Sequence, residues 1–464
     1  GEKQKKITFT QTGDKITVFK VRALETLGVG ELDVVAEGDG ETATYNIEMN
    51  ILPSNPTDTR SESRTIAAGD TASFSYKTFG IEETSDVVVE VSSLVPLNLQ
   101  KRMDYLTRYP HGCIEQVVSA VFPQLYLSTF MDLSSEKQKE IQDNIKAALD
   151  KIPDYQRENG GFSYWPSSNG RISKWATSYA GHFLIEARQK GYNVPEVVVR
   201  NWLTYQQRAA RNWSSYLENS SYSRLIQAYR LYTMALAGEA SAGDMNRLRE
   251  EDKLSPVAAW RLAAAYALAG KTSVAEKLTG RLKAEASDYD NPGPTYGSGL
   301  RDMAMILETL TLLEDRERGM ELMRDVARRI SDNSWYSTQT TAYSLLAIAK
   351  FVREENLDKP VRFEYKLNDK EAEKTVATQP LVQLHPDVMK NPQGQVRVVN
   401  DGESSLYVRT ITSGIPPAGM EQRSRSDLNI QVTYLDMAGN SVNPKRVEQG
   451  TDLIVEVKIA HPGV

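Results

Sequence analysis

Cysteine is almost absent from this sequence, which contains one such residue, Cys113, among 464. A single cysteine excludes an internal disulfide framework and leaves a buried inert thiol, a reactive thiol, or a link to another chain. Histidine is also scarce, and its four scattered positions form no spacing typical of a zinc site. A Gly-Lys-Ser/Thr phosphate loop and a Gly-x-Ser-x-Gly serine are missing too. The sequence therefore predicts neither a metal nor a cofactor.

Long apolar runs and dense runs of basic residues are also missing. The longest apolar stretches, such as residues 345–349, are far too short to cross a bilayer, and no signal sequence opens the chain. The net charge of −6 and the pI near 5.6 argue against nucleic acid or an anionic membrane as a partner. The chain starts and stops within strand-like patterns, so we expect a fragment, with any signal peptide or membrane anchor outside it.

The remaining composition is that of a soluble globular protein, with 40% apolar and 25% charged residues, and the length predicts about two to four domains. Alternating apolar and polar residues indicate strands in 7–52, including one at 15–24. Residues 53–69, rich in Ser, Thr, Asp and Pro, indicate a linker. Further strands are expected at 73–76, 87–91, 361–367, 396–399, 406–412, 428–434 and 453–459.

Between the two β regions the apolar period becomes helical. Helices are expected at 97–108, 113–130, 135–151, 174–190, 196–210, 223–237, 257–269, 273–286, 301–313, 320–330 and 338–351. Small-residue and aromatic pieces recur about every 35–50 residues, which is typical of repeated helix pairs. The two ends of the array resemble each other, as expected if it closes on itself. The order β, helical, β predicts a helical domain inserted into a β domain, with the chain divided as 1–52, 53–95, 96–356, 357–415 and 416–464.

The distinctive stretch is Tyr109-Pro-His-Gly-Cys-Ile-Glu-Gln116. Pro110 and Gly112 disfavour helix, and helical spacing follows, so Cys113 is expected in the first turn of a helix. There the positive end of the helix dipole is expected to favour thiolate and lower the pKa of Cys113. Gln116 follows three residues later on the same face. Attack of the thiolate on the Gln116 carboxamide, with loss of ammonia, would leave a γ-glutamyl thioester.

Such an acyl group survives only where water is excluded. Aromatic residues near the motif and on a Gly-rich loop are candidates for this shield: Tyr105, Tyr109, Phe122, Tyr126, Tyr164 and Trp165. His111 is either a nearby base or a hydrogen-bonding turn residue, and Glu115 is expected to point away from the ring as a first-turn acid at the helix dipole. His182 lies on an apolar helix face and is expected in the core.

This motif closely resembles the Gly-Cys-x-Glu-Gln thioester signature of the alpha-2-macroglobulin and complement family, particularly its bacterial branch. The resemblance extends to Asn159-Gly-Gly-Phe-Ser-Tyr-Trp-Pro and Trp335-Tyr-Ser-Thr-Gln-Thr-Thr-Ala-Tyr, and covers about residues 97–351. It implies an α/α toroid of about six helical hairpins, with Cys113 and Gln116 at one end. It also implies a CUB-like β domain in two parts, 53–95 and 357–415, and flanking macroglobulin-like β sandwich segments at 1–52 and 416–464.

The activity that the resemblance implies is protease inhibition rather than enzymatic turnover. A protease cuts a bait segment, the thioester is exposed, and an amine or hydroxyl of the protease is acylated by Gln116 and captured covalently. Some relatives use a histidine to speed transfer to hydroxyls, whereas the corresponding loop here offers Tyr296, which favours amines. The bacterial resemblance implies a cell-envelope location, periplasmic or surface-anchored.

Two other functions remain open. The first is a toroidal glycan-active enzyme, for which Tyr164 and Trp165 would stack on sugars and paired carboxylates would be required. Glu115 and Asp302 lie at suitable helix starts, but nothing in the sequence places a pair, and Cys113 and Gln116 stay unexplained. The second is a structural domain whose thioester does not form.

Overall fold

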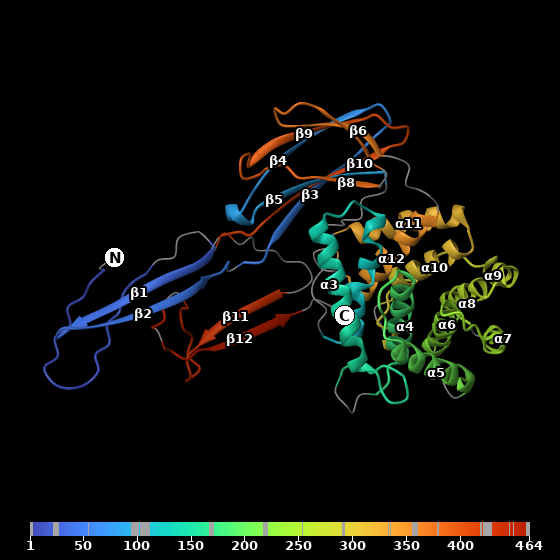
Figure 1. Ribbon diagram of the computed structural model, residues 1–464, viewed down its shortest axis with the longest axis horizontal. Helices are drawn as coiled ribbons and strands as arrows, with labels where there is room; N and C mark the ends of the chain where they lie inside the picture. Colours follow the sequence, from blue (N-terminus) through green and yellow to red (C-terminus); the bar gives the residue numbers. More distant parts are fainter. Residues whose placement is uncertain are drawn as a thin grey trace. The chain divides into compact units, whose positions relative to one another are not determined.

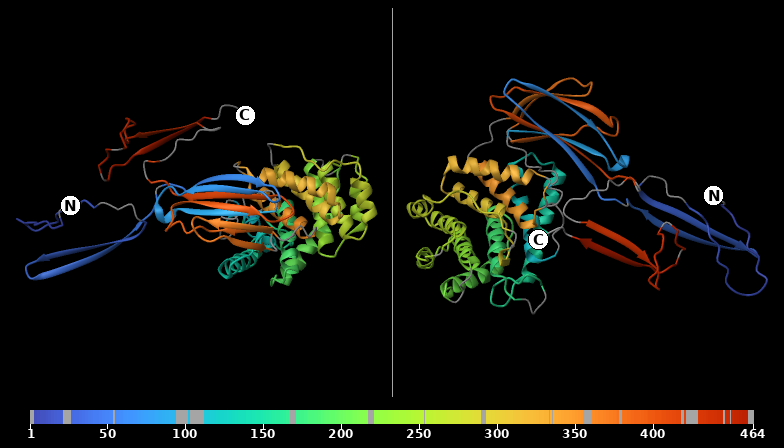
Figure 2. Two further views of the ribbon diagram at one scale, coloured as in Figure 1. Left: turned by 90° about the horizontal axis from the view of Figure 1, so that it is seen from above. Right: turned by 180° about the vertical axis from the view of Figure 1, so that it is seen from behind.

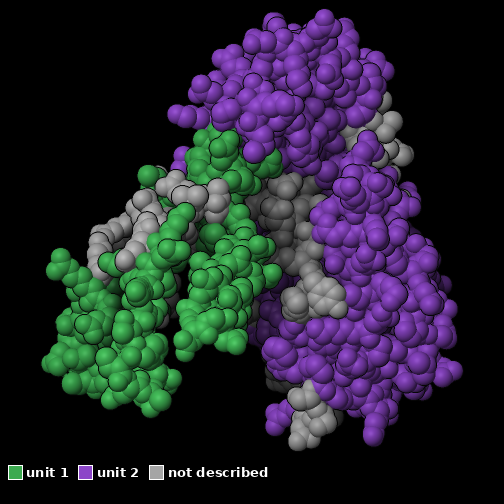
Figure 3. Space-filling model, turned by 60° about the vertical axis from the view of Figure 1, so that its left-hand side comes forward, with its two compact units in different colours: residues 1–59, 78–86, 413–464 green, residues 60–77, 87–412 purple. Residues whose placement is uncertain are grey.

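A computed structural model of the chain describes residues 3–21, 27–53, 55–93, 102, 112–166, 171–216, 221–252, 254–289, 293–332, 334, 336–354, 361–377, 380–417, 420, 429–444, 446–448 and 450–460. The chain divides into two compact units, which Figure 3 colours separately. Unit 1 comprises residues 1–59, 78–86 and 413–464, and unit 2 comprises residues 60–77 and 87–412. Unit 2 contains the helical array and a β sandwich (Figure 1).

Six helices of unit 2 form a closed ring. They are α2 (Ile114–Val121), α4 (Lys174–Gln189), α6 (Ser221–Leu236), α8 (Pro256–Leu268), α10 (Gly299–Leu312) and α12 (Thr338–Glu354). Each packs against the next, and α12 packs back against α2. These helices are buried nearly all round, as in α10, where every residue from Gly299 to Thr311 is buried. A helix that is apolar on all sides belongs inside a larger array.

A second layer of helices lies outside the ring. It consists of α3 (Ser135–Lys151), α5 (Glu196–Asn212), α7 (Ala242–Arg249), α9 (Thr272–Thr279) and α11 (Arg316–Ser331). Each packs on ring helices and buries only one stripe, as α3 does through Ile141, Ile145 and Ala148. Short 3₁₀ segments η2 (Pro123–Thr129), η3 (Ile152–Tyr155) and η4 (Gly293–Thr295) connect the array. This double ring confirms the predicted α/α toroid (Figures 1 and 2).

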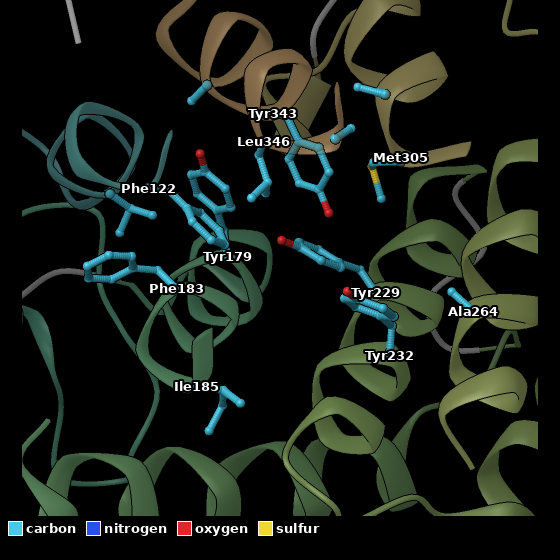
Figure 4. Packing of buried hydrophobic residues seen from close by; sticks show 14 of the residues in the cluster. Phe122, Tyr179, Phe183, Ile185, Tyr229, Tyr232, Ala264, Met305, Tyr343 and Leu346 are labelled. Atoms are coloured by element: carbon cyan, nitrogen blue, oxygen red, sulfur yellow. The ribbon is translucent and has the colours of Figure 1, made fainter. Parts of the chain in front are cut away.

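The interior of the toroid is aromatic as well as aliphatic. Tyr179, Tyr229 and Tyr343 converge from α4, α6 and α12 (Figure 4), and Tyr179 stacks on Tyr343 with ring centroids 6.3 Å apart. Close packing also fixes the contact between the layers. A Cβ on Gly181 would lie 2.0 Å from the Trp202 ring, so a side chain there has no space.

The β sandwich combines strands from both sides of the helical region. One sheet has the order β3-β10-β5-β8 and the other β4-β9-β6-β7. The strands are β3 (Asp58–Ile66), β4 (Thr71–Lys77), β5 (Asp86–Ser92), β6 (Val361–Leu367), β7 (Glu373–Ala377), β8 (Leu381–Leu384), β9 (Gln393–Asn400) and β10 (Leu406–Gly414). Phe74, Val89, Phe363 and Val408 meet in one core between the sheets. The helical array is therefore inserted into a β domain, as the β, helical, β order predicts.

Unit 1 contains two antiparallel hairpins. One pairs β1 (Gly28–Gly38) with β2 (Glu41–Ile51), and the other pairs β11 (Asn429–Leu435) with β12 (Ile454–Ala460). Most of their side chains are exposed, including Val35, Tyr45, Ile430 and Val457. Near them, Ile81 donates its backbone N–H to Ile415 over 2.8 Å.

The structure corrects several expected elements. Residues 53–69 are not a linker, because β3 lies within them; its side chains are polar and exposed except Ile66, which hides the strand from a hydrophobicity pattern. Residues 15–21 form no strand and are exposed. The helix expected at 113–130 ends at Val121, since Pro123 lacks the N–H that the next turn would need, and a 3₁₀ segment follows. The helix expected at 273–286 ends at Thr279.

Other expected features lie outside the described residues. These are all of the expected helix at 97–108 except Arg102, and the domain boundaries expected at 95–96 and 356–357.

Candidate functional site

Cys113 and Gln116 cap the same helix reciprocally. Cys113 is the residue before α2, with extended backbone (φ −75°, ψ 164°), and its sulfur accepts the backbone N–H of Gln116. In return, the Gln116 Oε1 accepts the backbone N–H of Cys113 at 3.3 Å. This is a capping box with cysteine in place of serine or threonine. It holds the thiol and the carboxamide side by side, although Cys113 stands one position before the helix rather than in its first turn.

Two neighbours fix the backbone that leads into this cap. Gly112 has φ of +82°, a left-handed conformation that glycine adopts without strain. The hydroxyl of the fully buried Tyr155 donates to the carbonyl oxygen of Gly112 over 2.6 Å. Tyr155 belongs to the 3₁₀ segment η3 and was not among the residues that the sequence singled out, because nothing in the motif marks so distant a partner.

The Cys113 and Gln116 side chains differ in their exposure to solvent. Cys113 is 2% exposed, whereas Gln116 is exposed. Burial raises the pKa of the Cys113 thiol, and the neighbouring Glu115 carboxylate raises it further, against the lowering effect of hydrogen bonds from Tyr164 and the Gln116 backbone. The expectation of a lowered pKa is therefore wrong, because it counted the helix dipole without the loss of water around the sulfur.

One predicted shielding residue, Tyr164, lies beside Cys113, and Trp165 and Tyr296 contact its ring. The Tyr164 ring stacks on Tyr296 with centroids 5.0 Å apart and meets Trp165 edge to face at 5.8 Å. The backbone carbonyl of Tyr164 accepts the N–H of Ile114 at 3.1 Å, which places Tyr164 next to Cys113. Tyr164 is half-buried, while Trp165 and Tyr296 remain 51% and 39% exposed.

The loops that carry these aromatic rings are internally braced. The Arg157 guanidinium donates to Ser163 Oγ at 2.6 Å and to the Trp165 carbonyl oxygen at 2.9 Å. Tyr296 has φ of +50°, an uncommon conformation for a bulky residue, and follows Thr295, whose carbonyl oxygen accepts a hydrogen bond from the buried Arg301. The position of the Tyr296 ring is therefore set by its loop.

Glu115 is the acid in the first turn of α2, as expected, and its side chain is buried in the protein. Its carboxylate accepts hydrogen bonds from Ser119 Oγ at 2.7 Å and from Thr338 Oγ1 at 2.8 Å. Burial raises the pKa of Glu115, and these two hydroxyls partly oppose the rise. Because Thr338 begins α12, Glu115 ties the start of α2 to the last helix of the ring.

Other predicted residues do not join the site. Phe122 packs against His182 and Phe183 in the core, and the Tyr126 hydroxyl donates to Glu186 at 2.5 Å, so neither shields Cys113. Tyr105, Tyr109 and His111 lie outside the described residues.

A second group of functional side chains, missed by the sequence pattern, occupies the toroid centre. His182, Glu186 and Glu308 each offer a ligand atom, and these atoms lie within 4.8 Å of one another. His182 is buried, as expected, but in a polar setting: its Nε2 is 2.7 Å from Glu186 and its Nδ1 is 3.0 Å from the Tyr229 hydroxyl. Only the spacing of His182 and Glu186, four residues apart, could have hinted at this group.

Basic side chains already neutralise this buried group. Lys350 Nζ donates to Glu186 Oε1 and, over 2.6 Å, to Glu308 Oε1, while Arg261 donates to Glu308 Oε2 at 2.8 Å. Burial by itself would raise the pKa of Glu308, but Lys350 and Arg261 outweigh it and hold that pKa well below its usual range. The Lys350 ammonium takes the place that a cation would need, so the group does not fit a metal ion.

A hollow lies elsewhere on the helical array. It has a volume of about 1830 Å³ and is lined by the segment 281–289 and by residues of α8, α10 and α11. Asp302 lines it, but this carboxylate is paired with Arg301 at 2.8 Å. Neither Cys113 nor the Glu186–Glu308 pair lines this hollow.

Comparison with known families matches the sequence to the model described as A-macroglobulin TED domain over residues 81–251, which include the capped Cys113. The alpha-2-macroglobulin of Escherichia coli strain K12 is 25% identical over 96% of this chain, and that of Xylella fastidiosa strain Temecula1 is 24% identical over 99%. The chain is therefore similar to alpha-2-macroglobulins over nearly all of its length. It spans 28% and 29% of the length of these two alpha-2-macroglobulins.

Solved alpha-2-macroglobulin structures share the fold. A Salmonella alpha-2-macroglobulin reacted with methylamine matches 95% of this chain and 29% of its own with a TM-score of 0.72 at 22% identity. A native E. coli alpha-2-macroglobulin fragment running from domain MG7 to the C-terminus matches 90% of this chain and 67% of its own with a TM-score of 0.66 at 22% identity. Within the described residues, no helix has the length and apolar content needed to span a membrane.

Proposed function

We propose that Cys113 and Gln116 join into an internal thioester and that this bond is the reactive group of a protease trap. The observation that carries the proposal is the reciprocal cap, in which each side chain accepts the backbone N–H of the other residue. The cap restricts both side chains to one small volume before any bond forms, which is the condition under which intramolecular acyl transfer becomes fast. The match to the model described as A-macroglobulin TED domain spans both residues.

The chemistry balances without a cofactor. The Cys113 sulfur attacks the side-chain carbonyl carbon of Gln116, the C–N bond breaks, and the amide nitrogen leaves as ammonia after taking up the thiol proton. An amine later attacks the same carbon, and the C–S bond breaks to give an amide on Gln116 and a thiol on Cys113. The protein consumes its one reactive bond in this step, so it acts once.

Exposure supports a direction for the second step. Gln116 is exposed and Cys113 is buried, so an amine reaches the acyl carbon from the solvent side while the sulfur departs inward. Tyr164, whose ring contacts Trp165 and Tyr296, lies next to the buried cysteine.

The partner that we propose is an attacking protease, captured through surface amines after it cuts a bait segment outside this chain. The cell envelope, periplasmic or surface-anchored, is the proposed location. A glycan-active toroid gains no support, because the central carboxylates Glu186 and Glu308 are neutralised by Lys350 and Arg261 and do not line the large hollow. A domain whose thioester does not form is the alternative that the following measurement decides.

The intact mass of the native protein should be lower than the sequence mass by one ammonia. Methylamine should then add covalently at Gln116 and release one titratable thiol. Peptide mapping should place the added group on Gln116. The control for background labelling is protein that was first denatured and treated with methylamine, so that any thioester has already reacted. An intact mass equal to that of the sequence, with a free thiol from the start, would leave only the structural alternative.

Replacing Gly112 with alanine is expected to displace the Gln116 carboxamide. A Cβ at this position would lie 2.1 Å from Gln116 Oε1, and the positive φ adds about 1–2 kcal/mol of strain. Because the Gln116 side chain is exposed, it moves and the fold survives. We expect most molecules of Gly112→Ala to lack the ammonia loss in intact-mass spectra. Gly191→Ala, with φ of +89° and no atom near the added Cβ, controls for strain and should keep the mass loss.

A further inference from the structure

The strap, residues 281–289, follows α9 and is neither helix nor strand. Its exposure alternates, because Leu282, Ala284 and Ala286 are half-buried and the residues between them are exposed. Alternation with a period of two is typical of an extended chain. Among the described residues, the backbone N–H groups of residues 283–288 have no hydrogen-bond partner. The strap therefore resembles a β-strand without a neighbour.

Two contacts tie the strap to α11. Near its start, the Lys283 carbonyl oxygen accepts the ring N–H of Trp260 at 3.1 Å. The Arg318 guanidinium of α11 lies over the same ring, 5.2 Å from its centroid. Near the end of the strap, Asp288 pairs with Arg329 of α11 at 3.3 Å. The strap consequently runs alongside α11.

The spacing of these ties agrees with an extended strap. The step from Lys283 to Asp288, at about 3.3 Å per residue, spans about 16 Å. The step from Arg318 to Arg329 along the helix, at about 1.5 Å per residue, also spans about 16 Å. Stretched between its ties, the strap leaves no slack with which to fill the hollow that it lines with α11.

This hollow suits a peptide better than a small molecule. Its volume of about 1830 Å³ exceeds the roughly 300–1,000 Å³ of small-molecule sites. Val257, Met303 and Met320 give it an apolar lining. Of the described residues that line it, seven are basic and five are acidic, on a chain whose net charge is −6. The hollow thus combines an unpaired backbone, apolar side chains and a local excess of positive charge.

We propose that the hollow beside the strap is a docking site for an extended, acidic segment of a partner protein. The segment pairs with the backbone of the strap, as peptides do when they add a strand to an open edge. Its alternate side chains meet the apolar lining, and its carboxylates meet the basic side chains. Arg324, exposed on α11 between the two ties and without an ion pair among the described residues, is the expected contact. This site is independent of the proposed thioester.

The probe is a fluorescein-labelled peptide of sequence Val-Glu-Val-Glu-Val-Glu, and its matched partner has Lys in place of each Glu. Fluorescence anisotropy with the 464-residue chain measures the affinity of both. The acidic peptide should bind about tenfold more tightly, because opposite charges favour its encounter and unlike charges disfavour the other. Equal affinities, a preference for the basic peptide, or no binding of the acidic peptide would each overturn the proposal.

Two proline substitutions test the backbone pairing. Successive N–H groups of an extended chain point to opposite edges, so Glu285→Pro and Ala286→Pro each remove a donor from one edge. Whichever edge pairs with the peptide, one of the two variants should bind the acidic peptide about tenfold more weakly. Thermal unfolding verifies that both variants fold. Unchanged affinity in both variants rules out pairing with the strap.

Arg324→Gln tests the charge and should weaken binding of the acidic peptide by about tenfold. Arg200→Gln is the matched control, since it removes an exposed arginine from α5, an outer helix that does not line the hollow. Equal affinities in these two variants contradict the assigned contact. A dimer of the chain that the peptide dissociates, seen by sedimentation, would instead assign the strap to a second copy. Binding to this chain but not to the full-length protein would assign it to another segment of the same polypeptide.

Discussion

Replacing Cys113 with alanine is expected to abolish methylamine incorporation at Gln116. No other residue can take over, because the sequence contains no second cysteine and an unactivated carboxamide does not exchange its nitrogen with a dilute amine. In the full-length protein the same substitution should abolish covalent capture of a protease, seen as loss of the conjugate that survives denaturing electrophoresis. The effect is complete loss rather than a reduced rate, since the acyl donor is never made.

The fold should tolerate this substitution. Alanine removes one capping acceptor at the start of α2, which costs about 0.5–2 kcal/mol. Gln116→Glu provides a second test: it keeps the oxygen that accepts the Cys113 N–H but replaces the carboxamide, so this variant should retain its thiol and show no ammonia loss. Incorporation that persists in Cys113→Ala would place the acyl donor at another residue and would contradict the proposed function.

The second large effect is expected at the toroid centre. Lys350→Met should lower the free energy of unfolding by about 3–5 kcal/mol at neutral pH, because it removes one partner from a buried ion network. Glu186 and Glu308, 2% and 1% exposed, would both lose the ammonium that contacts them. Equilibrium denaturation measures the change. Lys146→Met is the matched control: its pairing with Asp150 is at the surface, where solvent screens it, so its loss should leave the free energy of unfolding almost unchanged.

At acid pH the Lys350→Met substitution should lower the free energy of unfolding by less than at neutral pH. In the wild-type protein the pKa of Glu308 is held well below 4.5, so its contribution is present above that pH and is lost as the pH falls through the lower, folded-state value. Without Lys350 the carboxylates would be buried and poorly compensated, and they would take up protons more readily. The difference between wild type and variant should therefore be smaller at pH 4 than at pH 7. An equal stability difference at pH 4 and pH 7 would contradict an ionic origin of the destabilisation.

Periodicity predicted most of the helical array because the ring helices alternate with outer helices that bury one stripe. It also predicted strands β4, β6 and β10, whose inward residues are apolar. The polar strand β3 was missed, because it is held in its sheet by backbone pairing and few of its side chains are buried. Hydrophobic pattern contains no information about such a strand.

The motif likewise predicted part of the site. Local spacing brings Cys113 and Gln116 together, and the Gly-rich loop supplies Tyr164. The central charged group escaped prediction, because Glu186, Glu308 and Lys350 come from three helices far apart in sequence. The direction of the Cys113 pKa was wrong for a related reason: the burial that raises it comes from neighbours that only the folded chain assembles.

The packing of α12 against α2 has a consequence for when the proposed thioester can form. The capped cysteine lies at the start of the first described ring helix and Thr338, which holds Glu115, on the last, so more than two hundred residues must be synthesised and folded between them. Contacts so distant in sequence form late. A nascent or truncated polypeptide is therefore expected to present an unarmed thiol, and we expect the proposed electrophile to arise only once the circle of helices is sealed.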